Sequence, residues 1–296
     1  MEVQYEKIDL SEYTCSGEGG TAVSYTHKTR PALAKLYNSG FEADRAAAEF
    51  RTARIVFELG VPTPEPIRLI TDGERFGAEY ELIPGKRSFA RIISDEPARL
   101  EEISQEFARQ ARLLHTRQAD TARLRPYKQV LADFYTQKDL VPEEYKRRAL
   151  AFLETAPDAT TCLHGDLHIG NIITDGRKVR WIDVGEFSYG VPEWDLGVLF
   201  SMSHNLDRER AGNLFHVTPE VLTAHWDCFI AAYLGTGDSQ TVADYTRRLL
   251  PYYAVKVPYV YDMAYHSALP GQAFERLNPM LPVPDADSAI FRTFAH

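Results

Sequence analysis

The segment CLHGDLHIGNIITDGRKVRWIDVGEF, from Cys162 to Phe187, constrains this chain most, because it sets many chargeable groups among residues that form β-strands. Asp175-Gly176 is a strong turn signal, and the flanking runs NIIT and KVRWIDV are rich in β-branched and apolar residues. Asp183 sits inside the second of these apolar runs, and a carboxylate placed there needs a partner. The segment therefore predicts a β-hairpin that carries a polar site.

The register of the hairpin decides which groups meet. A two-residue turn pairs Thr174 with Arg177 and brings His168 opposite Asp183. A three-residue turn brings Ile169 opposite Asp183 instead. In both registers Asp183 lies beside the loop that precedes the first strand, within reach of facing and diagonal side chains.

Two metal sites are compatible with these residues. Asp166, Asn171 and Asp183 offer hard oxygen ligands suited to Mg²⁺, which takes one or two carboxylates together with substrate phosphates. His164, Asp166 and His168 offer a zinc alternative, although no further His/Cys cluster completes a closed zinc shell. A polar turn without chemistry is disfavoured by the buried setting of the second strand.

Composition excludes several classes of protein. The chain has 296 residues, enough for two lobes, and its 44% apolar content is typical of a soluble globular protein. A formal net charge of −9 argues against a nucleic-acid partner, which needs a basic surface. The sequence lacks an apolar run that could span a membrane and a signal-like start, and its cysteines do not form a disulfide framework. We therefore expect a cytoplasmic protein.

Hydrophobic patterning changes character along the chain. TAVSYTH and RPALAKLY, separated by a turn, are typical of an antiparallel strand pair. The two halves of IRLITDGERFGAEYELI are typical of two further strands joined at Asp72-Gly73, and a helix that ends at Gly60 lies between the two pairs. The segment PGKRS forms a natural linker, and helices follow from Ser94, with one apolar face at Ile103, Phe107, Ala111 and Leu114. This pattern predicts an α+β, bilobal fold, with a small β-rich lobe over residues 1–84 and a larger helical lobe over residues 85–296.

The sequence also resembles a known family. HGDLHIGN fits the kinase catalytic-loop frame H-x-D-L-x-x-x-N, and Asp183-Val-Gly185 fits the D-F-G frame. HGDLHIGNII followed by WIDVGE is more closely similar to the aminoglycoside phosphotransferase and choline kinase-like superfamily. The resemblance covers most of residues 15–200, and it implies small-molecule kinase activity on a protein-kinase-like fold.

Residue by residue, the resemblance implies roles in phosphoryl transfer. Asp166 would be the catalytic base or would orient the acceptor hydroxyl. Asn171 and Asp183 would hold Mg²⁺ against the phosphates of ATP, with GTP as an alternative nucleotide. Such a site works by positioning and charge neutralisation, so acids, an amide and a metal suffice.

Other polar residues are interpreted as supports. Asp195 resembles the helix-borne aspartate that braces the catalytic loop in this family. We expect His164 to support the loop by packing and hydrogen bonding. His168 is expected to support it too, and whether His168 has a further role is left open. His115 is assigned to the core.

The first lobe would bind the nucleotide. Lys35 in ALAKL matches the V-A-I-K lysine that contacts the phosphates, with Glu49 as its helical partner and Glu42 and Glu58 as rivals. The remaining expected nucleotide contacts come from the glycine-rich CSGEGGTAV and the hinge-like YELIPG: Gly17, Gly19, Gly20, Glu81 and Ile83.

We therefore predict an ATP/Mg²⁺-dependent phosphotransferase that acts on a hydroxyl of a small molecule such as an aminoglycoside-like antibiotic, an amino alcohol or a sugar. Gly165 stands where regulated protein kinases have Arg, and A-P-E is lacking, which favours a small acceptor over a protein. An atypical protein Ser/Thr kinase and a nucleotide-binding pseudokinase remain the alternatives. Residues 200–296 would set specificity, and their aromatic and acidic cluster suits either a core or a cation site: Tyr252, Tyr253, Tyr259, Tyr261 and Asp262.

Overall fold

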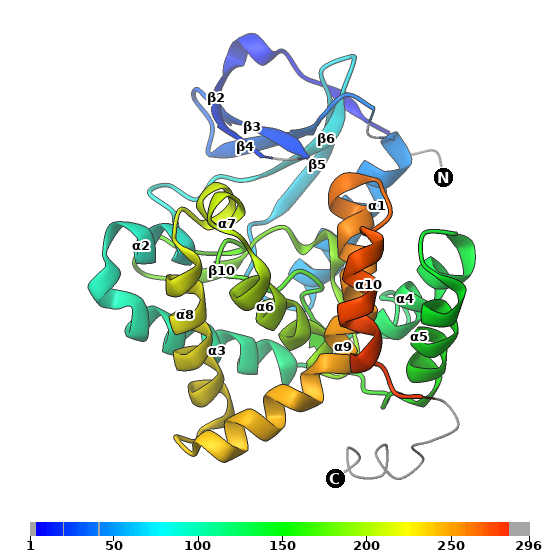
Figure 1. Cartoon of the computed structure of the whole chain (residues 1–296). Coiled ribbons are helices and arrows are strands. Elements are labelled where there is room, and N and C mark those ends of the chain that lie inside the picture. The colour runs from blue at the N-terminus through cyan, green and yellow to red at the C-terminus, as the bar shows by residue number, and fades with distance from the viewer. Residues whose placement is uncertain (1–3, 20, 41, 284–296) are drawn as a thin grey trace. The chain divides into compact units, whose positions relative to one another are not determined.

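The computed structural model describes residues 4–19, 21–40 and 42–283. The chain divides into two compact units. Figure 1 colours their elements by residue number. The sheet unit comprises Met1–Phe89 and Asn171–Phe187, and the helical unit comprises Ala90–Gly170 and Ser188–His296. The division into functional lobes at residues 84 and 85 stays a prediction.

A six-stranded sheet forms most of the sheet unit, in the order β1-β5-β6-β4-β3-β2. Neighbouring strands are antiparallel except for β1 and β5. Both hairpins expected from the sequence, β3 with β4 and β5 with β6, are confirmed. The strands are β1 (Glu6–Lys7), β2 (Tyr13–Glu18), β3 (Ala22–His27), β4 (Ala32–Tyr37), β5 (Pro66–Thr71) and β6 (Phe76–Glu81).

Helix α1 (Ala43–Glu58) packs against β5, β6 and the short 3-10 turn η3 (Val184–Glu186). Its apolar face is made largely of alanine, which has high helix propensity and lets the helix lie close to the sheet. The helix ends at Glu58, with Leu59 as its C-cap, and the following Gly60 has a φ of 73°, the left-handed conformation expected of a residue after a helix C-terminus.

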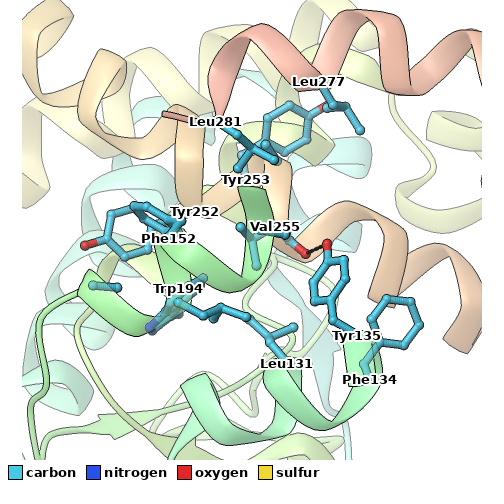
Figure 2. Close-up of a cluster of buried hydrophobic side chains, with 14 of the residues drawn as sticks. Leu131, Phe134, Tyr135, Phe152, Trp194, Tyr252, Tyr253, Val255, Leu277 and Leu281 are labelled. Carbon is cyan, nitrogen blue, oxygen red and sulfur yellow. Dashed lines mark hydrogen bonds between the residues drawn. The ribbon is translucent and has the colours of Figure 1, made fainter. Parts of the chain in front are cut away.

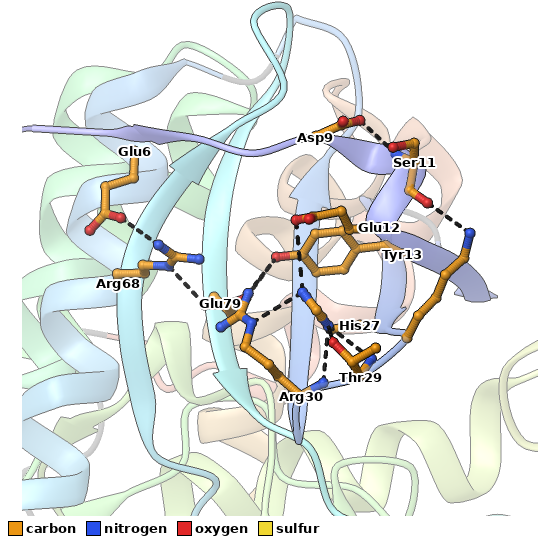
Figure 3. A network of polar contacts seen from close by, with 11 residues as sticks. Glu6, Asp9, Ser11, Glu12, Tyr13, His27, Thr29, Arg30, Arg68 and Glu79 are labelled. Carbon is orange, nitrogen blue, oxygen red and sulfur yellow. Dashed lines mark hydrogen bonds and ion pairs between the residues drawn. The ribbon is translucent and has the colours of Figure 1, made fainter.

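A buried carboxylate, Glu79, organises the polar contacts of the sheet (Figure 3). It accepts hydrogen bonds from the Tyr13 hydroxyl at 2.7 Å, from Arg68 Nε at 2.8 Å and from Arg30 at 3.1 Å. Burial favours the neutral acid, but these donors outweigh it and hold the pKa of Glu79 below its usual value. The network therefore links β2, β5 and β6 through one ionised group.

The hairpin predicted around Asp175-Gly176 is present, but in a different register. Strand β9 (Ile172–Thr174) pairs with β10 (Val179–Trp181), and Thr174 faces Val179. Neither the two-residue nor the three-residue turn is correct, because the loop contains four residues. The Asp175 carboxylate accepts the N–H groups of Arg177 and Lys178, each at 2.8 Å, which stabilises the wider loop.

The segment expected to be a linker adds a third strand to this hairpin. Strand β7 (Arg87–Ser88) pairs with β9 in antiparallel orientation. The hairpin is therefore part of a three-stranded sheet, β10-β9-β7, inside the sheet unit.

Nine α-helices and one two-stranded sheet form the helical unit within the described residues. The helix expected to begin at Ser94 begins later, because Pro97 opens a 3-10 turn and the residue before a proline disfavours the helical conformation. The elements are α2 (Phe89–Asp95), α3 (Leu100–His115), α4 (Tyr127–Gln137), α5 (Glu143–Thr155), β8 (Cys162–Leu163), β11 (Ser188–Tyr189), α6 (Glu193–Asn205), α7 (Arg208–Phe215), α8 (Pro219–Leu234), α9 (Ser239–Tyr265) and α10 (Gly271–Leu277).

An aromatic core holds α4, α5, α6 and α9 together (Figure 2). Tyr252 and Tyr253 lie within this core, so the cation-site alternative does not apply to them. The Tyr145 hydroxyl donates to the carbonyl of Ala254 at 2.7 Å. Pro258, inside α9, lacks the N–H that would bond this carbonyl in a regular helix, so Tyr145 supplies the missing donor.

The described helices include none with the length and apolarity required to cross a membrane.

Candidate active site

A pocket of about 270 Å³ opens in the sheet unit between the six-stranded sheet and the β9–β10 hairpin. Its lining includes the apolar residues Leu33, Ala53, Ile83, Ile173 and Ile182. It also includes the charged residues Lys35, Glu49, Glu81, Lys86 and Asp183. A ligand that combines an apolar group with an anionic group suits such a lining.

Lys35 and Asp183 form an ion pair in this pocket. Burial disfavours the charged lysine, but Asp183 outweighs that effect and raises the pKa of Lys35 above its ordinary value. Asp183 adopts a left-handed backbone conformation with φ 54° and ψ 47°, and 47% of its side chain is exposed. Two opposite charges thus neutralise each other at a site that ligands can reach.

Glu49 lines the same pocket, whereas its rivals Glu42 and Glu58 are not among the lining residues. It accepts a hydrogen bond from the Tyr37 hydroxyl, and Arg45 Nε lies 3.8 Å from its carboxylate. Gly185 lies close to it, because an added Cβ would lie 3.1 Å from Glu49 Cγ, a tight contact that would require the Glu49 side chain to shift. The glycine of the D-x-G motif therefore leaves room for the Glu49 side chain.

The expected phosphate-loop glycines differ in their positions. Gly19 lines the pocket, and its N–H donates to the Ala22 carbonyl at 2.8 Å. Gly17 lies in β2 next to a register shift and is not among the lining residues. Gly20 lies outside the described residues.

The backbone donors of the hinge-like segment differ in whether they have a protein acceptor. Glu81 N–H donates to the Glu65 carbonyl at 2.8 Å, and Leu82 N–H donates to the Pro31 carbonyl at 3.0 Å. Glu81 and Ile83 both line the pocket. In the part of the chain that the structure describes, the Ile83 N–H has no protein acceptor.

Sequence reasoning missed Lys86 and Tyr80, which also line the pocket. Burial and the positive charge of Lys35 lower the pKa of Lys86, while Asp183 acts in the opposite direction. Burial, together with Glu49 and Asp183, raises the pKa of Tyr80 to about 12 despite the opposing effect of Lys35. Lys86 follows Pro-Gly in the segment expected to be a linker, so the sequence did not indicate that it belongs to the pocket.

Asn171 and Asp183 lie at the open end of the hairpin, before β9 and after β10. Ile182 N–H donates to the Asn171 carbonyl at 2.9 Å, which continues the strand pairing up to the site. Asn171 is buried, with 5% of its surface exposed. An amide oxygen and a carboxylate are the donor set that Mg²⁺ prefers, so the residues present fit that ion.

The loop that carries Asp166 lies in the helical unit and is fixed by Asp195 of α6. Asp195 is fully buried and accepts the N–H groups of His164 at 2.7 Å and Gly165 at 2.9 Å. His115 Nε2 lies 3.1 Å from the same carboxylate. Burial raises the pKa of Asp195, but His115 and the nearby positive charges outweigh it and keep the group ionised.

The Asp166 carboxylate is accessible, with 41% of its side chain exposed. His168 Nδ1 accepts the Gly170 N–H at 3.1 Å, which leaves the proton on Nε2, 3.3 Å from Asp166 Oδ2. Burial would raise the pKa of Asp166, but His168, His164 and Lys256 hold it well below its usual value. Asp166 is therefore an ionised acceptor at neutral pH.

The zinc alternative finds no support in these positions. His164 Nδ1 accepts the N–H of Asp166 at 3.3 Å, and His168 is engaged as described above. Among residues 4–283, apart from 20 and 41, no group of three His, Cys, Asp or Glu side chains is placed to hold a metal.

A family model described as the phosphotransferase enzyme family matches residues 17–226. The chain belongs to this family. The resemblance seen in HGDLHIGN and WIDVG is therefore confirmed, and the protein is a phosphotransferase. None of the curated proteins matches the sequence.

Solved structures share the fold at low sequence identity. A thermostable mutant of aminoglycoside phosphotransferase APH(4)-Ia, in ternary complex with AMP-PNP and hygromycin B, matches with TM-score 0.62 and 14% identity over 96% of this chain and 95% of that one. Plasmodium vivax ethanolamine kinase matches with TM-score 0.54 and 15% identity over 92% and 80%. A choline/ethanolamine kinase family protein from Mesorhizobium loti matches with TM-score 0.52 and 15% identity over 92% and 88%. The α+β kinase-like fold is confirmed.

Proposed function

We propose that this phosphotransferase moves the γ-phosphate of ATP to a hydroxyl of a small molecule, with Mg²⁺ as the metal. The observation that carries the proposal is the pocket lined by the Lys35–Asp183 ion pair, by apolar side chains and by Ile83, whose N–H has no protein acceptor among the described residues. A purine base would pack against the apolar side chains, and its ring nitrogen would accept the Ile83 N–H.

The phosphates would replace the contacts that the two charged residues make with each other. Lys35 would bind phosphate oxygens, with Lys86 as a second cation in the same pocket. Asp183 and Asn171 would hold Mg²⁺, which neutralises charge on the phosphates when bound. Glu49 would orient Lys35 through charge, since it contributes to the raised pKa of that lysine.

Asp166 would accept the proton of the acceptor hydroxyl as the catalytic base, or would orient that hydroxyl. Its carboxylate is ionised and accessible, and His168 holds its orientation from one side. Catalysis by such a group requires correct placement more than high basicity, because the transferred phosphoryl needs little covalent assistance.

A small acceptor is favoured over a protein. The APH(4)-Ia neighbour was solved with hygromycin B, and the Plasmodium vivax neighbour is named an ethanolamine kinase, so one protein of this fold binds a small molecule and another is named for one. The segment between Asp183 and α6 is short and begins with the 3-10 turn η3. These features support an amino alcohol, a sugar or an aminoglycoside as the acceptor class.

The test is a panel of hydroxylated amines, sugars and aminoglycosides incubated with ATP or GTP and Mg²⁺, with ADP or GDP release and ³¹P spectra of the products as readouts. We expect at least one phosphate ester, formed only with Mg²⁺. Phosphate transfer to protein Ser/Thr but to no compound of the panel would identify a protein kinase. Nucleotide binding without any turnover would identify a pseudokinase.

A further inference from the structure

Helix α9 buries a lysine that the roles assigned above do not use. Lys256 lies in the run YYAVKVPYVY, and only 1% of its surface is exposed. Burying an ammonium group in an apolar core is costly unless hydrogen bonds and charges compensate it. The contacts of the Lys256 side chain should therefore indicate its role.

The Lys256 ammonium contacts the backbone of the catalytic loop directly. Its Nζ donates to the carbonyl of Gly165 and, at 3.3 Å, to the carbonyl of Trp194 at the start of α6. The group also lies 4.4 Å from the centre of the Tyr127 ring, a favourable position for a cation. All of these residues belong to the helical unit.

Gly165 is consequently held at both of its backbone polar groups. Its N–H donates to Asp195 and its carbonyl accepts from Lys256. Its φ of 85° is a conformation that side-chain-bearing residues rarely adopt. Since the Gly165 carbonyl belongs to the peptide that joins it to Asp166, rotation of this peptide would move the Asp166 carboxylate.

We propose that Lys256 is a positioning residue for phosphoryl transfer, which fixes the Gly165–Asp166 peptide and places positive charge behind the Asp166 carboxylate. This inference rests on the proposed function, in which Asp166 faces the acceptor. The charge of Lys256 also contributes to the lowered pKa values of Asp166 and Asp195, together with the neighbouring histidines. The Lys256 ammonium thus affects both the catalytic carboxylate, Asp166, and the carboxylate that anchors the loop, Asp195.

The simpler alternative is that Lys256 only stabilises the fold. The protein provides a matched comparison, because Tyr135 also donates a buried hydrogen bond to a carbonyl, that of Val255 in α9, at 2.7 Å (Figure 2). This bond is adjacent to Lys256 in sequence but does not involve the catalytic loop. Tyr135→Phe therefore removes a comparable buried donor without touching the loop.

The experiment compares Lys256→Met with Tyr135→Phe in the full chain. ADP release from ATP and Mg²⁺ is measured with an acceptor from the panel and with water alone, and folding is followed by urea denaturation. Misplacement of a catalytic group by about 1 Å can cost about 100-fold in rate, so we expect kcat of Lys256→Met to fall at least about 30-fold. KM for ATP should change less than about threefold, because the pocket residues lie in the sheet unit. Tyr135→Phe should lose stability but keep kcat within about threefold of the unmodified chain.

Hydrogen exchange gives a readout that does not require activity. In Lys256→Met, the amides of His164 and Gly165 should exchange faster than in Tyr135→Phe, because the loop loses one of its two anchors. If the unmodified chain releases no ADP, the proposed function fails, while unchanged exchange in this loop would overturn the positioning role separately.

The inference is overturned if folded Lys256→Met keeps the kcat of Tyr135→Phe. If the methionine variant does not fold, Lys256→Arg replaces it, since it keeps the charge but its planar guanidinium cannot reproduce the ammonium's contacts. We expect kcat of Lys256→Arg to fall about tenfold at nearly constant KM. Full activity of Lys256→Arg would overturn the positioning role.

Discussion

The catalytic loop of the helical unit and the charged pocket of the sheet unit differ in how their polar groups are held. The backbone of the loop is anchored by fully buried partners, Asp195 and Lys256, that no ligand has to displace. The central contact of the pocket is the accessible Lys35–Asp183 ion pair, whose members are both proposed to contact the ligand. In the proposed function, the loop is organised before substrate binds, whereas the pocket residues would exchange their own contacts for contacts with the nucleotide. Four substitutions test this difference, from the largest expected effect to the smallest.

Removing the charge that the loop presents should have the largest effect. Asp166→Asn keeps the size of the side chain but not the anion, and loss of a general base costs about 100- to 10,000-fold in kcat. Nucleotide affinity, measured by calorimetry, should change little. Asp158→Asn is the control, because that carboxylate is 85% exposed and pairs only with Lys128 among the contacts observed. A kcat within tenfold of the unmodified chain would remove Asp166 from the reaction.

Breaking the buried anchor should reduce stability in a pH-dependent way. Asp195→Asn leaves at least one loop N–H without its acceptor, and we expect a loss of about 3 kcal/mol in the free energy of unfolding near pH 7. The folded-state pKa of Asp195 lies below its ordinary value, so its stabilisation is present above the unfolded pKa and is lost as pH falls through the folded pKa.

Urea denaturation between pH 7 and 3 measures this effect. The difference between the unmodified chain and Asp195→Asn should stay constant down to about pH 5 and shrink below about pH 4. A difference that grows on acidification would contradict the assignment of Asp195 as an ionised anchor.

Removing the carboxylate of the Lys35–Asp183 ion pair should abolish the metal dependence of nucleotide binding. Asp183→Ala removes a proposed Mg²⁺ ligand, and we expect the affinity for ATP in the presence of Mg²⁺ to fall about 100-fold, or about 2.7 kcal/mol. Calorimetric titrations with and without Mg²⁺ measure the change. If the variant keeps Mg²⁺-dependent turnover, the metal assignment is wrong.

Removing the second cation of the pocket should have the smallest effect. Lys86→Met should raise KM for ATP about tenfold, or about 1.4 kcal/mol, and leave kcat within threefold. The loss should be greater for ATP than for adenosine if Lys86 binds phosphates. Lys178→Met, in the exposed loop of the hairpin, is the matched control. Equal losses for ATP and adenosine would assign Lys86 to a different part of the ligand.

The chemistry-bearing motifs were predictable from the sequence because each combines residue type with spacing. HGDLHIGN and WIDVG together led to the family that the comparison confirms, and Asp72-Gly73 and Asp175-Gly176 located their turns. The hairpin register was not predictable from the turn dipeptide alone. The Asp175 side chain bonds two backbone N–H groups beyond the dipeptide and stabilises a longer loop.

Residues whose role depends on long-range packing were missed. Lys86 follows a Pro-Gly pair and resembles an ordinary linker lysine, and only the folded sheet unit brings it to the pocket. Lys256 left a clearer signal, because a lone cation inside the apolar, aromatic run YYAVKVPYVY needs buried partners, by the same reasoning that was applied to Asp183. The identity of those partners, which are 62 and 91 residues away in sequence, required the structure.

Pro258, one of two prolines inside α9, makes a backbone hydrogen bond of that helix depend on another helix. Because Pro258 cannot donate to the Ala254 carbonyl, the hydroxyl of Tyr145 in α5 completes a bond that is normally internal to a helix. Tyr145 and Pro258 should therefore be inherited as a pair: a homologue with an ordinary residue at 258 has no need of the hydroxyl, and one that keeps the proline does. The backbone hydrogen bonding of the helix that carries Lys256 therefore depends on a side chain more than one hundred residues earlier in the sequence.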